Sequence, residues 1–162
     1  MTEQDNLQSL QNGSGSGNQF VTIRLGGQLI GLPIDKVHDV FYPDNFTSVP
    51  LAMTQIAGVL NLRGRIVTII DLSVIMGMEA VNRTISERPA VGIEYANESY
   101  GLLTDTLGEV VTLQNDLFEP NPINLDPGWA ELSLGTFRLE NELLVVLDID
   151  ALIDGLLKQN AA

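Results

Sequence analysis

An internal repeat constrains the fold of this chain more than any other feature of the sequence. The segment 58–72 (GVLNLRGRIVTIIDL) has a degenerate copy 77 residues later, at 135–149 (GTFRLENELLVVLDI). In each copy a glycine precedes an apolar run, a polar turn follows, and a second apolar run ends near an aspartate. This pattern predicts a β-hairpin. Only the first copy has a basic turn, Arg63-Gly64-Arg65.

A second pair of matching segments lies outside the hairpins. Residues 30–40 align with residues 100–110 at an offset of 70, with glycine, leucine, aspartate and valine at equivalent positions. The offset grows to 77 in the hairpins, which implies a seven-residue insertion in the second half. The proline-rich segment 114–131 can hold it. Short apolar strands can resemble each other by chance, but two colinear blocks favour a duplication.

The remaining patterns predict many short strands and a few short helices. Alternating apolar residues predict strands near 20–25, 29–34, 37–41, 90–95, 99–104 and 110–113. A proline suits the first turn of a helix, so Pro50 is expected to open one that runs to Ala57. Asp71 and Asp148 are expected to cap helical turns, and Asp150 to cap the closing helix. We predict a long loop over 114–131. The fold class is therefore mainly β, with barrels favoured.

Composition bounds the class of protein. The 162 residues include 21 acidic and 8 basic side chains, so the formal net charge is −13, and there is no cysteine. Phosphate contacts need a positive field, so nucleic-acid binding is disfavoured. No apolar run reaches the roughly 20 residues of a membrane-spanning helix, and the first residues lack the pattern of a signal peptide. We expect a cytoplasmic protein without direct membrane insertion.

Candidate catalytic residues are scarce. The chain has a single histidine, His38, and it has no serine in a nucleophile-elbow motif for which this histidine could act as the base. The pair Asp105-Thr106 resembles part of a two-aspartate protease site, but the equivalent Asp35 is followed by lysine, so no symmetric dyad forms. No calcium-loop or phosphate-loop motif occurs. We predict no catalytic residue, no cofactor and no metal site, and keep a small acidic β-barrel hydrolase with paired carboxylates as the rival interpretation.

The basic turn is the remaining candidate for a site. Arg63 and Arg65 are two of only eight cations in an acidic chain. They form either a solvated turn or a partner-facing one, anchored by Asn61 and by the conformational freedom of Gly64. Arginine suits a binding role because its planar fork pairs with carboxylates through two hydrogen bonds.

Four segments in this order resemble the CheW-type adaptor proteins of bacterial chemotaxis. They are residues 31–40, the hairpin 58–72, residues 100–110, and the closing LLVVLDIDALI at 143–153. The resemblance implies a CheW-like fold of two intertwined SH3-like five-stranded β-barrels with a few short helices. It also implies an adaptor without catalytic activity. Such an adaptor couples the cytoplasmic tips of chemoreceptors to the regulatory domain of a CheA-like histidine kinase.

The resemblance also implies a set of partner-binding residues. Val37, Asp39, Gly58, Arg63 and Val110 fall on family positions implicated in partner binding, and we add Asn61 and Gly64 from the basic turn. An ion pair between Asp39 and Arg63 is expected.

The expected organisation is a flexible tail at 1–18, a CheW-like domain at 19–157 and a short tail at 158–162. Within the domain, the two intertwined subdomains lie at roughly 19–85 and 86–157. A non-flagellar output, such as type IV pili or phototaxis, is the alternative within the same family.

Overall fold

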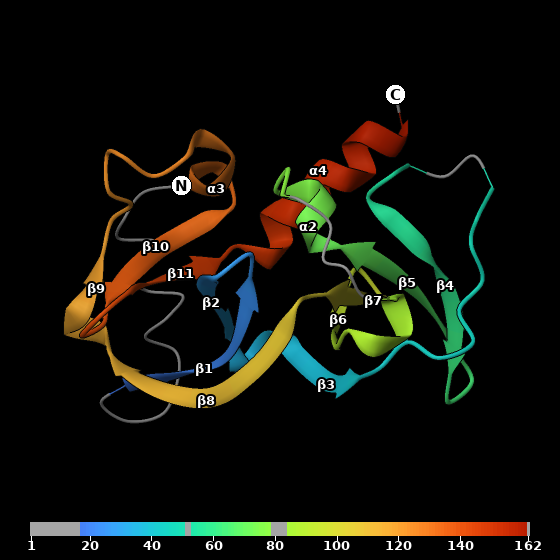
Figure 1. Ribbon diagram of the computed structural model, residues 1–162, viewed down its shortest axis with the longest axis horizontal. Helices are drawn as coiled ribbons and strands as arrows, with labels where there is room; N and C mark the ends of the chain where they lie inside the picture. Colours follow the sequence, from blue (N-terminus) through green and yellow to red (C-terminus); the bar gives the residue numbers. More distant parts are fainter. Residues whose placement is uncertain (1–16, 51–52, 79–83, 162) are drawn as a thin grey trace.

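The computed structural model describes residues 17–50, 53–78 and 84–161, and its strands form two sheets (Figure 1). The six-stranded sheet has the order β8-β1-β2-β11-β10-β9. Its strands are β1 (Gly17–Leu25), β2 (Gln28–Pro33), β8 (Thr106–Gln114), β9 (Phe118–Glu119), β10 (Ser133–Arg138) and β11 (Leu143–Leu147). The five-stranded sheet has the order β3-β6-β7-β5-β4. Its strands are β3 (Val37–Phe41), β4 (Ile56–Leu62), β5 (Arg65–Asp71), β6 (Ala90–Tyr95) and β7 (Glu98–Leu103).

Helices are short and few in the described part, which confirms the prediction of a mainly β fold. The α-helices are α2 (Leu72–Ile75), α3 (Pro127–Glu131) and α4 (Ile149–Ala161). Single turns of 3-10 helix are η1 (Ile34–Lys36), η2 (Ile85–Glu87) and η3 (Asn115–Leu117). One sheet has the expected five strands, and the other gains the two-residue β9 as a sixth.

The register of the strand pairs reproduces the sequence repeat residue by residue. Gly31 pairs with Thr22 in the β1–β2 hairpin, and its equivalent Gly101 pairs with Gly92 in the β6–β7 hairpin. Gly31 and Gly101 are 70 residues apart, and so are their partners Thr22 and Gly92. The parallel pairs agree as well, because β11 meets β2 in the same register in which β5 meets β7. The duplication inferred from the sequence is therefore present in three dimensions.

The two repeats exchange one strand each. β3 follows the first repeat's hairpin but pairs with β6, while β8 pairs with β1. The five-stranded sheet is thus built from residues 37–103, and the six-stranded sheet from 17–33 together with 106–147. In Figure 1 the blue strands β1 and β2 accordingly lie beside the gold to red strands β8 to β11. The division expected near residue 85 separates the two repeats along the sequence. The chain passes from one sheet to the other at different places, between β2 and β3 and between β7 and β8.

Three hydrophobic clusters hold the sheets together. The largest one joins the inner faces of both sheets with α2 and α4, which meet in Figure 1. It includes Ile23 from β1, Ile93 from β6, and Leu152 from α4, each at most 2% exposed. Smaller clusters lie within each sheet, around Phe137 in one and around Ile69 in the other. The largest cluster therefore contains residues of both sheets, so the two sheets share a hydrophobic core.

The structure corrects the helix expected from Pro50 to Ala57. Among its described residues, Thr54 and Gln55 form a turn and β4 begins at Ile56. The amide of Asp71 donates to the carbonyl of Gln55 at 2.8 Å, which extends the pairing of β4 with β5. Sheet pairing therefore overrides the local helix signal of a proline, a weak prior.

Other expectations at element ends are confirmed or corrected. Asp71 and Asp148 cap helices as predicted, because their carboxylates accept from the amides of Ser73 and Ala151 at 3.0 Å. Asp150 lies inside α4 and is not its cap. Gly17 and Asn18, assigned to the tail, belong to β1, and residues 1–16 lie outside the described part. α4 extends to Ala161, so most of the expected C-terminal tail is helical.

The segment 114–131 is not a structureless loop. It contains η3, the strand β9 and the helix α3, whose first turn has a proline. The carboxylate of Asp126 accepts from the amide of Gly128 at 2.9 Å and caps that helix.

Candidate partner-binding surface

The turn between β4 and β5 presents an arginine in an unusual backbone conformation. Arg63 and Gly64 have φ angles of +54° and +84°, the pattern of a two-residue type I′ turn. The side-chain oxygen of Asn61 accepts from the amide of Gly64 at 3.0 Å and closes the turn. A side chain at Gly64 would meet nothing within 4 Å, so glycine serves the backbone conformation there. The turn fixes Arg63 on an exposed tip.

A shallow hollow brings Asp39 of β3 close to the flanks of this turn. It is lined by Asp39 and Phe41 from one side, by Leu62 and Arg65 from the hairpin, and by Tyr100 from β7. Gly92 opposite Asp39 leaves the room that the carboxylate occupies. Arg65 rather than Arg63 shares the hollow with Asp39. The expected ion pair between Asp39 and Arg63 is not among the ion pairs of the described residues.

The other predicted site residues lie in three different environments. Val37 is half-buried and packs against the shared core, and Gly58 is buried beneath Phe46. Val110 lies on β8, an edge strand of the other sheet, with 52% of its surface exposed. The structure therefore brings Asp39 beside Leu62 and Arg65 of the hairpin, which were not among the predicted site residues, and it leaves Val110 on a separate sheet.

Val40 was not among the predicted partner-binding residues. It lies on β3, the edge strand of the five-stranded sheet, and pairs with Val91 as its equivalent Val110 pairs with Val21. Both valines are exposed. The offset of 70 between the repeats contained this signal, because it relates Val40 directly to Val110.

The charges around the turn are free to meet a partner. In the described part, neither Arg63 nor Arg65 has a carboxylate within 4.0 Å. The arginines near the equivalent β10–β11 hairpin are paired instead: Arg24 binds Glu142 through two contacts of 2.9 Å, and Arg138 lies 3.6 Å from Glu119. Among the described residues, the β4–β5 turn therefore presents positive charge without an ion-pair partner, on a strongly acidic protein.

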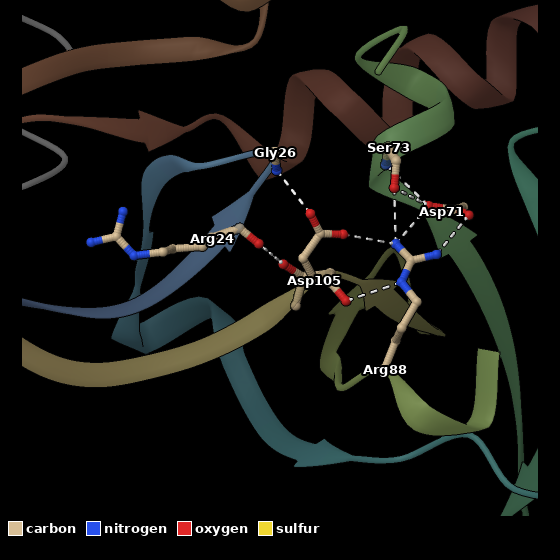
Figure 2. A network of polar contacts seen from close by, with 7 residues as sticks. Arg24, Gly26, Asp71, Ser73, Arg88 and Asp105 are labelled. Atoms are coloured by element: carbon tan, nitrogen blue, oxygen red, sulfur yellow. Dashed lines mark hydrogen bonds and ion pairs between the residues drawn. The ribbon is translucent and has the colours of Figure 1, made fainter. Parts of the chain in front are cut away.

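Two carboxylates do converge, and they converge on an arginine (Figure 2). Arg88, only 3% exposed, donates to both carboxylate oxygens of Asp71 at 3.1 and 3.2 Å and approaches Asp105 at 3.5 Å. It also donates to the hydroxyl of Ser73 at 2.9 Å and to the carbonyl of Thr104 at 3.3 Å. Such an arrangement satisfies a buried guanidinium. It does not resemble two carboxylates that share a proton.

Arg88 is a second residue that sequence reasoning missed. It stands in the connector before β6, next to Pro89, and no local pattern distinguishes it from a solvated cation. In the described part, no group of three or more histidine, aspartate or glutamate residues could hold a metal ion. The helices described there are too short or too polar to cross a membrane.

Fold and surface together define a duplicated, two-sheet β protein with exposed edge strands. The sequence model of the family described as CheW-like domain matches residues 19–156. A crystal structure of scaffolding protein TtCheW from Thermoanaerobacter tengcongensis superposes with a TM-score of 0.71 and 25% identity, covering 81% of this chain and 88% of that one. The chain therefore belongs to the CheW-like family.

Curated relatives agree with this assignment. Chemotaxis protein CheW of Rhizobium meliloti is 25% identical over 135 residues, covering 83% of this chain and 86% of the relative. Chemotaxis protein CheW of Klebsiella aerogenes is 28% identical over 137 residues, covering 85% and 82%. Protein PilI of Pseudomonas aeruginosa is 27% identical over 138 residues, covering 85% and 74%.

Proposed function

We propose that this chain is a non-enzymatic adaptor that couples chemoreceptor cytoplasmic tips to the regulatory domain of a CheA-like histidine kinase. It would work in the cytoplasm and be recruited to receptor arrays at the membrane. The family assignment and the relatives named as chemotaxis and scaffolding proteins support this proposal.

The relation between the hollow and the hairpin tip indicates which residues bind the partner. The hollow beside Asp39 and the unpaired tip of the β4–β5 hairpin adjoin each other on the five-stranded sheet. Apolar side chains in the hollow can supply most of the binding energy, and the arginines can orient the partner and select it by charge. Val37, Asp39, Asn61, Arg63 and Gly64 are the residues that we propose for this surface, with Gly58 shaping it from below.

Val110 and Val40 extend the proposal to the edge strands. Each is an exposed valine on a strand that ends its sheet. Edge strands offer unpaired backbone groups and apolar side chains to a partner. We propose that partners contact both sheets, with Val110 on one and Asp39 on the other.

The rival interpretations differ in what supports them. The hydrolase needs two carboxylates that act on a substrate, but Asp71 and Asp105 are both engaged by Arg88. An adaptor for a non-flagellar array, controlling type IV pili or phototaxis, shares the fold and the surface. Protein PilI is about as similar to this chain as the chemotaxis relatives are, so identity does not separate these outputs.

Calorimetric titration with the regulatory domain of the cognate CheA-like kinase and with a cognate receptor tip tests the proposal. We expect Arg63→Ala to weaken one of these affinities by on the order of tenfold, because a charged contact is lost at the interface. Glu140→Ala is the matched control, since Glu140 occupies the equivalent position of the β10–β11 turn and is exposed. Unmeasurable binding to every cognate kinase and receptor would overturn the adaptor proposal, and equal affinities of wild type and Arg63→Ala would remove Arg63 from it.

A further inference from the structure

The chain passes between the two sheets at two places that the repeat makes equivalent. The first crossover is η1, between β2 and β3, and the second is the pair Thr104-Asp105, between β7 and β8. Asp35 and Asp105 are equivalent at the offset of 70. The strands on either side of both crossovers pair in the same register, so the two crossovers can be compared position by position.

The second crossover is tied to both sheets by a polar network around the buried Arg88 (Figure 2). On the six-stranded side, the carboxylate of Asp105 accepts from the amide of Gly26 at 2.8 Å, in the β1–β2 turn. The hydroxyl of Thr104 and the amide of Asp105 donate to the carbonyl of Arg24 at 2.8 and 3.2 Å. Each of these bonds joins the crossover to the β1–β2 hairpin, either at its turn or near the end of β1.

Arg88 supplies the ties on the five-stranded side. Its Nε donates to the carbonyl of Thr104, its Nη1 to the carboxylate of Asp71, and its Nη2 to Asp71, Ser73 and Asp105. Asp71 ends β5 and Ser73 lies in α2, so both belong to the five-stranded side. The buried side chain of Arg88 therefore links the end of β5 to the crossover. The crossover in turn is bonded to the β1–β2 hairpin of the other sheet.

The first crossover has no comparable network in the described part of the chain. Asp35 is exposed, and no hydrogen bond joins it to Ala96, the equivalent of Gly26 in the β6–β7 turn. The nearest tie is an ion pair of 3.4 Å between Lys36 and Asp150, whose side chains are 43% and 51% exposed. An exposed pair of this kind constrains geometry only weakly. The position equivalent to Arg88 is Asn18, which bonds instead to Asn115.

We infer that Arg88 is a positioning residue that locks one of the two crossovers and so fixes the orientation of the two sheets relative to each other. The crossover at Thr104-Asp105 is the fixed one, and η1 is the compliant one. A buried guanidinium with a planar fork suits this role, because it holds several acceptors at fixed angles where an ammonium would act as a point charge. This inference rests on the network and stands apart from the proposed function.

Hydrogen exchange in the unmodified protein gives the first test. Gly26 and Ala96 occupy equivalent positions in two type I′ turns, with φ of +58° and +51°. Amides that open only with the lock exchange slowly, so we expect the protection factor of Gly26 to exceed that of Ala96 at least about tenfold. Equal protection of the two amides would overturn the inference.

Distance distributions between spin labels give the second test. The chain has no cysteine, so Gln19→Cys on β1 and Glu98→Cys on β7 place one label on an exposed position of each sheet. The network is then removed without leaving an unpaired buried charge, by Arg88→Met with Asp71→Asn and Asp105→Asn. Asparagine retains the side-chain acceptors for the amides of Ser73 and Gly26.

We expect this triple variant to broaden or shift the distance distribution between the two labels, while Lys36→Met at the other crossover leaves it unchanged. A purely stabilising role for Arg88 would lower the urea midpoint and leave the distribution as in the wild type, which would refute the inference. So would a Lys36→Met variant that broadens the distribution as much as the triple variant. If the triple variant does not fold, the exchange comparison between Gly26 and Ala96 decides.

Discussion

Gly58 and Gly135 occupy equivalent bulges, one in each sheet, and each leaves room for a phenylalanine of the neighbouring segment. A Cβ at Gly58 would lie 2.8 Å from the ring of Phe46 and 2.5 Å from the carbonyl oxygen of Thr47. A Cβ at Gly135 would overlap the ring of Phe118 and lie 2.8 Å from the carbonyl oxygen of Glu119. The register shift of β4 lies between Ile56 and Gly58, and that of β10 lies between Ser133 and Gly135. The glycines that align in the sequence therefore serve one steric purpose twice.

Alanine at either glycine should destabilise the protein. Gly58→Ala pushes a methyl group against backbone, and we expect a loss of about 2 kcal/mol in the free energy of unfolding. Gly135→Ala should cost more, because its φ of +154° also disfavours a side chain. Gly155→Ala is the control: nothing lies within 4 Å of its Cβ position in α4, and alanine there should add about 0.5–1 kcal/mol. Urea denaturation measures all three, and unchanged stability of Gly58→Ala would contradict the steric role.

We expect Arg63 to lower the stability of the fold while it strengthens partner binding. Its φ of +54° disfavours a long side chain, whereas asparagine is common at this position of a type I′ turn. We expect Arg63→Asn to raise the free energy of unfolding by about 0.5 kcal/mol. The same substitution should weaken partner binding as Arg63→Ala does. Thermal or urea denaturation beside a titration with kinase and receptor checks both effects, and a destabilised Arg63→Asn would contradict the strain argument.

Tyr95 should titrate far above its ordinary range. Its hydroxyl donates to the carboxylate of Asp154 on α4, which, with a smaller effect of desolvation, raises the pKa of Tyr95 to about 12. The bond therefore stabilises the fold fully below about pH 10, the ordinary tyrosine pKa, and its contribution is lost as the pH rises through 12. We expect Asp154→Asn to move the pKa back toward 10. NMR titration of Tyr95 would contradict this if both proteins gave the same pKa.

Glu142 should titrate below its ordinary range. The hydrogen bonds from Arg24 lower the pKa of Glu142, opposed in part by desolvation, and the charge of Arg24 lowers it further. A lowered carboxyl pKa stabilises the fold above the ordinary value, and that contribution is lost as the pH falls through the lowered one. Arg24→Met should return the pKa of Glu142 to its ordinary range in an NMR titration. A pKa of Glu142 that does not respond to Arg24→Met would refute the pairing.

Much of the fold follows from local patterns in the sequence. The β1–β2, β4–β5 and β6–β7 hairpins each have short-range turn chemistry, and their two-residue turns all have positive φ. Aspartates that cap helices were found for a similar reason, since a cap acts within three residues. The helix expected after Pro50 was wrong because β5 recruits that segment as a partner, which no local signal reveals.

The candidate site was predictable only in part. Asn61 and Gly64 could be assigned to the turn from the sequence, because both act within the turn itself. The neighbour of Asp39 could not, and the structure places Arg65 rather than Arg63 beside it. Arg63 lies in the turn itself, in a left-handed backbone conformation, whereas Arg65 begins β5 and pairs with Leu62, which lines the same hollow.

The duplication, the hairpins, the mainly β class and the basic turn could all be predicted from the amino-acid sequence. The duplication is visible when the two halves are aligned, and alternation and turn chemistry act over a few residues. Which strands share a sheet depends on the tertiary fold, since the exchange of β3 and β8 pairs residues about 50 to 100 positions apart. The tertiary fold alone also assembled the Arg88 network from four separate segments of the chain. The partners of a buried charge are brought to it by the packing of the whole fold, so the residues next to it in the sequence do not predict them.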